Sequence, residues 1–294
     1  MTKTRKSTEV KQSDARSYDA TAAEFGTLTE RYSTRIAARM LDLGGVKSGE
    51  RLLDVGTGTG LLARMAAARG ANAVGIDHSA GMLGQAQARS DQDGVGSRTE
   101  FLAMDAEALD FDDEAFDVTV SLFVLRHLPN PRAAAREMYR TLKSGGRLVT
   151  TIGARPSPFS VSGMSAASDR VQGKLGRVLL APGSLRQFLQ SKGIQLRGDH
   201  AAHGHLGKVG KMLRSAGFRD VQRKWWGERH VLSPEEFWDV QAVFDSDARA
   251  TLTALDEDTQ RKLKRQYIAA CDDHVRRGRK LVYRTGALIF TATR

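Results

Sequence analysis

The stretch Arg51-Leu-Leu-Asp-Val-Gly-Thr-Gly-Thr-Gly60 decides the fold of this chain. It reads as a short strand over residues 51–55 that runs into a glycine loop and then into a helix over 61–69. Glycines let the backbone turn tightly and approach a ligand closely, at the edge where an open parallel sheet binds its ligands. The stretch therefore predicts an α/β protein with a ligand site directly after its first strand.

The spacing of the three glycines narrows the class of ligand. A dinucleotide loop of the pattern Gly-x-Gly-x-x-Gly needs its third glycine where this chain has Leu61, and the Gly-Lys-Ser/Thr of a phosphate-binding P-loop is missing. Asp54 stands two residues before the first glycine, where its carboxylate can meet an amine-bearing or cationic ligand. The sequence of the loop therefore matches neither of these two common nucleotide-binding motifs.

Strands and helices alternate on both sides of this loop. After a helical segment from Tyr18 to Leu43, short apolar runs separated by helical patterns predict strands. The strands are expected at 51–55, 71–76, 99–103, 116–122, 147–152, 219–226 and 287–292. The alternation predicts an α/β fold with a Rossmann-like, seven-stranded, mostly parallel sheet that carries helices on both faces.

The composition along the chain divides it into four parts. Residues 1–17 are polar and charged and are expected to form a disordered basic tail, and 18–153 are expected to form the Rossmann-like core that binds the ligand of the glycine loop. The alternation of strands and helices stops in the proline-containing stretch 154–206, which we expect to be an insertion or cap over the ligand site after the fifth strand. Residues 207–294 are expected to complete the sheet, with a helical lid between the last two strands. This lid is expected to be one long helical region from the start signal at Ser233-Pro-Glu-Glu236 to about Arg277.

The bulk composition excludes several classes of protein. Of the 294 residues 40% are hydrophobic, yet no apolar run approaches the roughly 18 residues that a membrane span needs. The N-terminus lacks the pattern of a secretory signal. Cys271 is the only cysteine, which excludes an internal disulfide framework and a multi-thiolate metal site. We expect a cytoplasmic protein without a membrane span.

The net charge of +11 is carried by the second half of the chain. Residues 1–150 hold 20 basic and 20 acidic side chains, whereas residues 151–294 hold 25 and 14. Single lysines and arginines are usually solvated surface groups, but such an excess favours an anionic partner.

Five segments, taken together and in order, resemble the class I S-adenosylmethionine-dependent methyltransferase superfamily. They are the glycine loop, Gly75-Ile-Asp-His-Ser-Ala-Gly-Met82, Met104-Asp-Ala-Glu107, Phe116-Asp117 through His127-Leu-Pro-Asn130, and Leu142-Lys-Ser-Gly-Gly146. The resemblance runs from about Tyr18 to the end, and the layout is most similar to ubiquinone/menaquinone-type and natural-product small-molecule methyltransferases. It implies S-adenosylmethionine as the cofactor and S-adenosylhomocysteine as the product.

The resemblance also implies roles for single residues. The glycine loop borders the methionine portion, Asp77 accepts from both ribose hydroxyls, Met82 packs on the adenine, and Asp105 accepts from the adenine amine. Ala106 offers its backbone N–H, and the sulfonium lies beside Leu122 or Phe123. The implied cofactor set is Tyr18, Asp54, Gly56, Thr57, Gly58, Gly60, Asp77, His78, Met82, Asp105, Ala106, Leu122 and Phe123.

Two residues past the fourth strand are candidates for catalysis. His127 is the first choice for a base or an acceptor-orienting group, although a histidine here can also be structural. Arg126 is an alternative group that can clamp a carboxylate or phosphate. Tyr18 precedes the sheet, where an aromatic ring in similar methyltransferases covers the cofactor; packing on the sheet edge is its alternative role.

Three features in the basic half stay open. His200, His203 and His205 can line an acceptor pocket or sit in a surface loop, and no cysteine or carboxylate pair completes a metal site, so no metal is predicted. Trp225-Trp226 can stack on a ligand or pack the sheet edge. The run Arg276-Arg-Gly-Arg-Lys280 can meet an anion or simply end a helix.

The expected activity is methylation of a small, anionic or natural-product acceptor on oxygen, carbon or nitrogen. The alternative is a peptide or carrier-bound biosynthetic intermediate gripped by the basic half. An RNA methyltransferase is disfavoured because Ser121-Leu-Phe-Val-Leu replaces the Asn/Asp-Pro-Pro-Tyr/Phe of amino-methylating nucleic-acid enzymes. A non-enzymatic role is disfavoured by the intact Asp54, Asp77 and Asp105, and a homodimer is left open.

Overall fold

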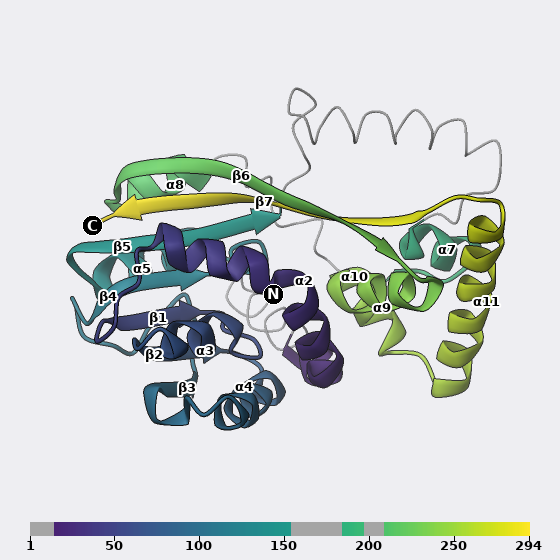
Figure 1. Ribbon diagram of the computed structural model, residues 1–294, viewed down its shortest axis with the longest axis horizontal. Helices are drawn as coiled ribbons and strands as arrows, with labels where there is room; N and C mark the ends of the chain where they lie inside the picture. Colours follow the sequence, from purple (N-terminus) through teal and green to yellow (C-terminus); the bar gives the residue numbers. More distant parts are fainter. Residues whose placement is uncertain (1–14, 154–183, 197–208) are drawn as a thin grey trace, which may run out of the picture. The chain divides into compact units, whose positions relative to one another are not determined.

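A seven-stranded sheet with the order β3-β2-β1-β4-β5-β7-β6 organises the chain (Figure 1). The computed structural model describes residues 15–153, 184–196 and 209–294. The strands are β1 (Arg51–Val55), β2 (Asn72–Asp77), β3 (Thr99–Ala103), β4 (Phe116–Ser121), β5 (Leu142–Gly153), β6 (Arg219–Leu232) and β7 (Leu281–Thr293). The predicted Rossmann-like, seven-stranded sheet is therefore confirmed.

The first five strands are parallel and keep a common register. β1 pairs with β2 on one side and β4 on the other, so that Asp54 lies opposite Gly75 and Val120. β2 pairs with β3 and β4 with β5 in the same direction. The strand order reverses between β1 and β4, and such a switch point opens a crevice at the carboxyl ends of the strands.

The chain divides into two compact units, which we describe separately. The first unit comprises residues 1–153, 203–226 and 288–294, and the second comprises 154–202 and 227–287. β6 and β7 each run from one unit into the other, because both strands contain a boundary between them.

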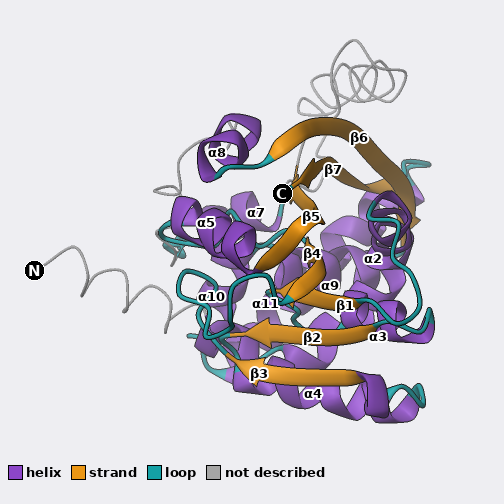
Figure 2. Ribbon diagram, turned by 90° about the vertical axis from the view of Figure 1, so that its left-hand side faces the viewer, coloured by secondary structure: helices purple, strands orange, loops and turns teal. Residues whose placement is uncertain are grey.

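Helices cover both faces of the sheet in the first unit (Figure 2). α2 (Ala22–Leu43) packs on both α3 (Leu61–Ala68) and α4 (Ala80–Gln92), and α5 (Pro131–Thr141) packs on α8 (Val209–Ala216). Inward residues of α5 and α8, such as Met138 and Leu213, share one buried core with strand residues such as Leu53 and Phe116. That apolar core fixes where the strands end.

The second unit is mainly helical in its described residues. It contains α7 (Leu185–Ser191), α9 (Pro234–Phe244), α10 (Ser246–Leu252) and α11 (Glu257–Arg276). The ring of Tyr267 on α11 lies at its centre, 5.1 Å from Phe188 and 5.7 Å from Trp238 between ring centroids. Burial raises the pKa of the neighbouring Cys271 thiol to about 12, which marks this lone cysteine as a core residue.

The structure corrects three boundaries. Residues 15–17, expected in the disordered tail, are helical. The single long helical region expected up to Arg277 is three helices, because Asp245 and Asp256 cap the first turns of α10 and α11. β6 and β7 exceed the predicted 219–226 and 287–292, since both continue into the second unit.

No helix among the described residues is long and apolar enough to cross a bilayer. No group of three potential metal ligands occurs in the part of the chain that the structure describes.

Candidate functional site

The glycine loop crosses the carboxyl end of β1 in a backbone conformation that favours glycine. Gly56, Gly58 and Gly60 have φ of 69°, 55° and 79°. A Cβ on Gly56 would lie only 2.3 Å from Cγ2 of Val124, which follows the neighbouring strand β4. The loop after β1 therefore packs against the loop after β4 through the space that the missing side chain leaves. Nothing in the sequence pattern pointed to Val124.

Asp54 is a buried carboxyl group beneath this loop, only 1% exposed. Its Oδ2 accepts hydrogen bonds from Thr57 Oγ1 at 2.7 Å and from the Ala63 backbone N–H at 3.3 Å. Its Oδ1 has no hydrogen-bond partner among the described residues. Burial raises the pKa of Asp54 from 3.8 to about 7. A buried carboxyl oxygen without a donor fits the ammonium group of an amino-acid-like ligand.

Asp77 ends β2 with a half-buried side chain. Its Oδ2 accepts from the Gly58 backbone N–H at 2.9 Å, and its Oδ1 accepts from the Ser79 N–H at 3.0 Å. Burial raises its pKa, while these backbone hydrogen bonds act in the opposite direction. Because a carboxylate offers about four lone-pair positions, the two bonds leave acceptors for a pair of hydroxyls. The orientation of Asp77 is thus set by the loop itself.

The next strand end carries Asp105. Its Oδ1 accepts from the Glu107 backbone N–H at 2.9 Å and lies 3.5 Å from Nε2 of His78. The structure thus brings these two predicted residues together. Ala106 and Met82 are both buried, at 5% and 1% exposure. Their contacts with an adenine ring remain predictions.

The loop after β4 holds the remaining strand-end residues. Phe123 has a φ of 64°, a left-handed conformation uncommon for an aromatic residue, and its N–H donates to Oγ1 of Thr151 on β5 at 2.9 Å. Leu122 beside it is half-buried. The Arg126 side chain is exposed, and its Nη1 lies 3.6 Å from the position of a Cβ on Gly153, the last residue of β5.

Three rings link the N-terminal helices to these loops. Tyr18 packs edge-on against Phe25 at 5.4 Å and against His127 at 6.1 Å between ring centroids. The Phe25 ring in turn lies 3.8 Å from the position of a Cβ on Gly58. The structure therefore brings together Tyr18 and His127, which are 109 positions apart, and adds Phe25. The helical pattern gave no sign of which α2 side chain faces the loop.

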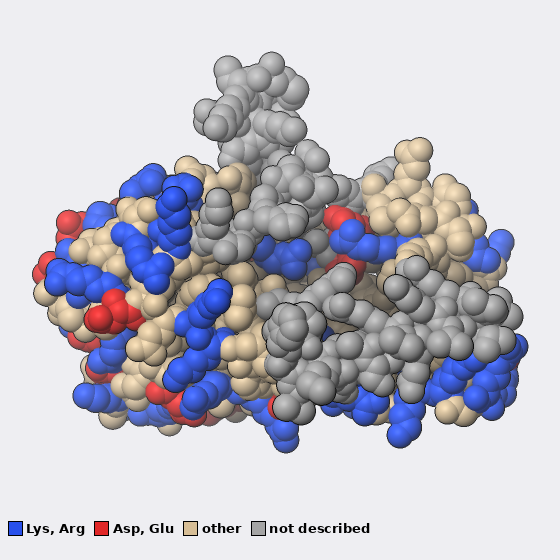
Figure 3. All heavy atoms as spheres, turned by 90° about the horizontal axis from the view of Figure 1, so that it is seen from above, with Lys and Arg blue, Asp and Glu red and all other residues tan. Residues whose placement is uncertain are grey.

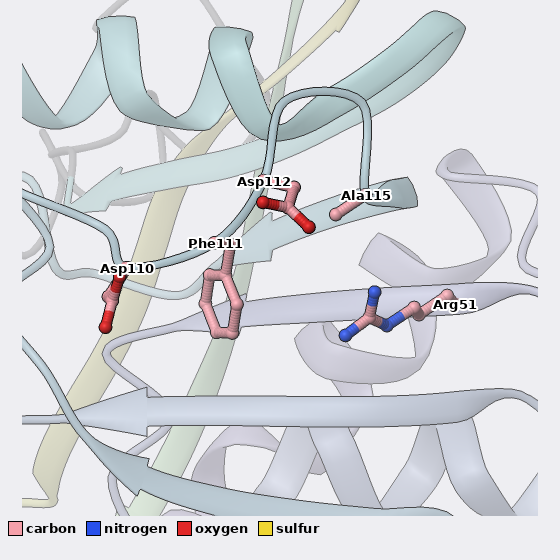
Figure 4. A pocket seen from close by; sticks show the side chains of 5 residues that line it. All are labelled: Arg51, Asp110, Phe111, Asp112 and Ala115. Carbon is pink, nitrogen blue, oxygen red and sulfur yellow. The ribbon is translucent and has the colours of Figure 1, made fainter.

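A pocket of about 250 Å³ lies away from all of these residues (Figure 4). Arg51, the first residue of β1, lines it, whereas the glycine loop follows the last residue of that strand. Its other lining residues are Asp110, Phe111, Asp112 and Ala115. The pocket contains none of the predicted site residues, so we do not assign the cofactor to it.

The open features of the basic half are placed only in part. His200, His203 and His205 lie outside the described residues. Trp225 and Trp226 are half-buried residues of β6. The basic run 276–280 begins at the last residue of α11 and includes the C-cap Arg277, which pairs with Asp273 at 2.8 Å.

Known proteins share both sequence and fold with this chain. Residues 53–150 match the family described as a methyltransferase domain. A demethylmenaquinone methyltransferase of Clavibacter sepedonicus is 34% identical over 178 residues, which cover 60% of this chain and 69% of that protein. A 27-O-demethylrifamycin SV methyltransferase of Amycolatopsis mediterranei is 34% identical over 56% of this chain and 60% of its own length. Other curated relatives match over 42% to 59% of their length.

Solved structures with low sequence identity share the fold. The YcgJ protein of Bacillus subtilis has a TM-score of 0.56 at 18% identity, over 88% of this chain and 97% of that one. The cyclase SpnF has a TM-score of 0.51 at 23% identity, over 89% and 81%. Since a cyclase shares this architecture, the reaction has to be argued from the site and not from the fold.

Proposed function

This chain is a class I S-adenosylmethionine-dependent methyltransferase, and we propose that it methylates a small anionic acceptor, a natural product or biosynthetic intermediate, on oxygen, carbon or nitrogen. When bound, S-adenosylmethionine supplies a methyl group on a sulfonium, which is already a good leaving group. The protein then has to hold the two reactants in line and keep water out.

Two carboxylates would hold the cofactor. Asp54 would accept from its ammonium group through the buried oxygen that has no donor among the described residues, and Asp77 would accept from the ribose hydroxyls with an orientation set by Gly58 and Ser79. The remaining residues of the predicted cofactor set lie on the loops after β1, β2, β3 and β4, apart from Met82 in the first turn of α4 and Tyr18 before α2.

The proposal of an anionic acceptor rests on the exposure and the pairing of the Arg126 side chain. Its guanidinium is exposed, reaches the end of β5, and forms no ion pair within the described part of the chain. A guanidinium can bind a carboxylate or phosphate through two parallel hydrogen bonds. An arginine at the carboxyl edge of the sheet that no described carboxylate pairs with is therefore suited to an acceptor that brings its own negative charge.

His127 follows directly and would orient the acceptor or remove its proton. Its backbone N–H donates to the Val124 carbonyl at 2.8 Å, and its ring contacts Tyr18. A base is required only for acceptors that must lose a proton, such as a hydroxyl, so the protonation state of the acceptor decides how much His127 contributes.

The charge distribution and the relatives both support this proposal. Lys and Arg side chains are spread over the face shown in Figure 3, where Asp and Glu are confined to small groups. The demethylmenaquinone and rifamycin methyltransferases named above act, by their names, on small molecules. A peptide or carrier-bound intermediate would use the same positive charge, and it is the alternative acceptor.

The test compares matched acids and esters as acceptors. Methyl transfer from labelled S-adenosylmethionine is measured for phenolic acids and for their methyl esters, and we expect the acids to be preferred through a lower KM. Arg126→Gln should remove that preference, whereas Arg136→Gln, an exposed arginine within α5, should keep it. Equal use of acids and esters by the wild type would refute an anionic acceptor. Label entering a carrier-protein or tRNA fraction instead would favour the alternatives.

A further inference from the structure

Residues 15–21, which we call the N-terminal arm, are joined to the start of α4 by one side chain. Asp19 Oδ1 accepts hydrogen bonds from Ser79 Oγ at 2.5 Å and from the Gly81 backbone N–H at 2.9 Å. Ser79 is the N-cap of α4, and its Oγ also accepts from the Met82 N–H at 3.0 Å. Asp19 therefore shares the cap of a helix that lies 60 positions further along the chain.

Gly81 makes this approach possible. A Cβ on Gly81 would lie 3.0 Å from Asp19 Oδ1 and 3.1 Å from Asp19 Cα, distances that real Cβ contacts rarely show. Alanine favours a helix more than glycine does, so the helix alone gives no reason for glycine here. The space that glycine leaves is filled by the arm.

The contact of Asp19 lies next to the groups assigned to the cofactor. The N–H of Ser79 donates to Asp77, and Asp77 in turn accepts from Gly58 of the glycine loop. On the other side of Asp19, the Tyr18 ring contacts His127. The arm thus spans from the end of β2 to the loop after β4, across the edge of the sheet where the cofactor is expected.

Ion pairs that do not involve Asp19 hold α2 against the helices α3 and α4. Glu30 on α2 pairs with the buried Arg64 of α3, which also pairs with Asp93 after α4. Arg89 of α4 lies 3.8 Å from Glu30. Loss of the Asp19 contact would therefore detach the arm from α4 and leave α2 in place.

We propose that Asp19 is a positioning residue that latches the N-terminal arm across the cofactor site and so determines how long S-adenosylmethionine stays bound. The proposal rests on the cofactor site assigned above. The latch consists of one carboxylate oxygen that accepts two hydrogen bonds, and of a glycine whose missing Cβ lets that oxygen approach. Either partner can be altered without touching a residue that meets the cofactor.

The test measures cofactor binding without any acceptor. Calorimetry and stopped-flow dissociation of S-adenosylhomocysteine are compared for the wild type, Asp19→Ala, Asp19→Asn and Gly81→Ala. We expect Asp19→Ala to weaken binding about tenfold, mainly through faster dissociation, because two hydrogen bonds to a charged acceptor are lost. Asp19→Asn keeps an amide oxygen that can accept both bonds, so its affinity should stay within about threefold of the wild type.

Gly81→Ala separates positioning from folding. It should weaken binding as Asp19→Ala does, while the unfolding temperature of the ligand-free protein does not fall, and the double variant should be no weaker than either single one. Glu24→Ala removes an exposed carboxylate from the first turn of α2 and should leave affinity unchanged. Wild-type affinity in Asp19→Ala would overturn the latch, and so would weak binding that tracks a lowered unfolding temperature. Since no acceptor is present, either result leaves the acceptor proposal standing.

Discussion

Asp54→Asn should make the ligand-free protein more stable at alkaline pH while it weakens cofactor binding. The carboxyl group is 1% exposed, and burial raises its pKa from 3.8 to about 7. In the unfolded chain the group ionises near its ordinary pKa. Asparagine can still accept from Thr57 and Ala63 through its amide oxygen, but it carries no charge to bury.

The magnitude follows from the difference between the two pKa values. A carboxyl group whose pKa is raised in the folded state contributes its full stability below pH 3.8 and loses it as the pH rises to about 7. The difference between a pKa of 3.8 and one of about 7 corresponds to about 4 kcal/mol in the free energy of unfolding. About 3 kcal/mol of this decrease in the free energy of unfolding occurs between pH 5 and pH 8 in the wild type. Asp54→Asn has no carboxyl group to ionise at this position and does not show the decrease.

The assay is urea unfolding of the ligand-free wild type and of Asp54→Asn at pH 5 and at pH 8. Groups that titrate in both proteins cancel when the two free energies of unfolding are subtracted. The free energy of unfolding of the variant minus that of the wild type should be about 3 kcal/mol larger at pH 8 than at pH 5. In parallel, its affinity for S-adenosylmethionine should fall, because the asparagine NH2 takes the place of Oδ1, carries no negative charge and cannot accept a hydrogen bond from an ammonium group. A stability difference that does not change with pH would refute the buried, poorly ionised carboxyl group.

Three further changes probe the site. Asp77→Ala should weaken S-adenosylmethionine binding by about 1–3 kcal/mol through unpaired ribose hydroxyls, and unchanged calorimetric affinity would remove Asp77 from the site. His127→Ala should slow turnover without changing cofactor affinity, and full activity would make this histidine structural. Gly56→Ala should cost about 2–4 kcal/mol in the free energy of unfolding, since it adds a contact at 2.3 Å to the strain of a positive φ. Gly45→Ala, where φ is 55° with open space around the Cβ, is the control; an equal loss there would show that Val124 contributes nothing.

The strand ends of the first unit could be predicted because the signals for them are local. Glycine spacing, apolar runs and turn residues each act over a few positions, and parallel pairing then aligns the ends of β1, β2 and β3. Asp54, Asp77 and Asp105 were therefore placed at one edge of the sheet before any tertiary contact was known. The caps Asp245 and Asp256 were equally local, but the continuous helical pattern around them hid both breaks.

The sequence by itself determined the α/β class and the order of the loops that follow the parallel strands, because these depend on residue types at short spacing. It indicated the kind of cofactor through the resemblance of those loops to the class I methyltransferase superfamily. Only the tertiary structure decided which distant groups share a space. Val124 occupies the place of a Gly56 side chain, and Asp19 reaches Gly81 across 62 positions. The same holds for the raised pKa of Asp54, since burial by residues from several elements causes it. Such effects depend on volume and dielectric surroundings, which no short pattern of residues encodes.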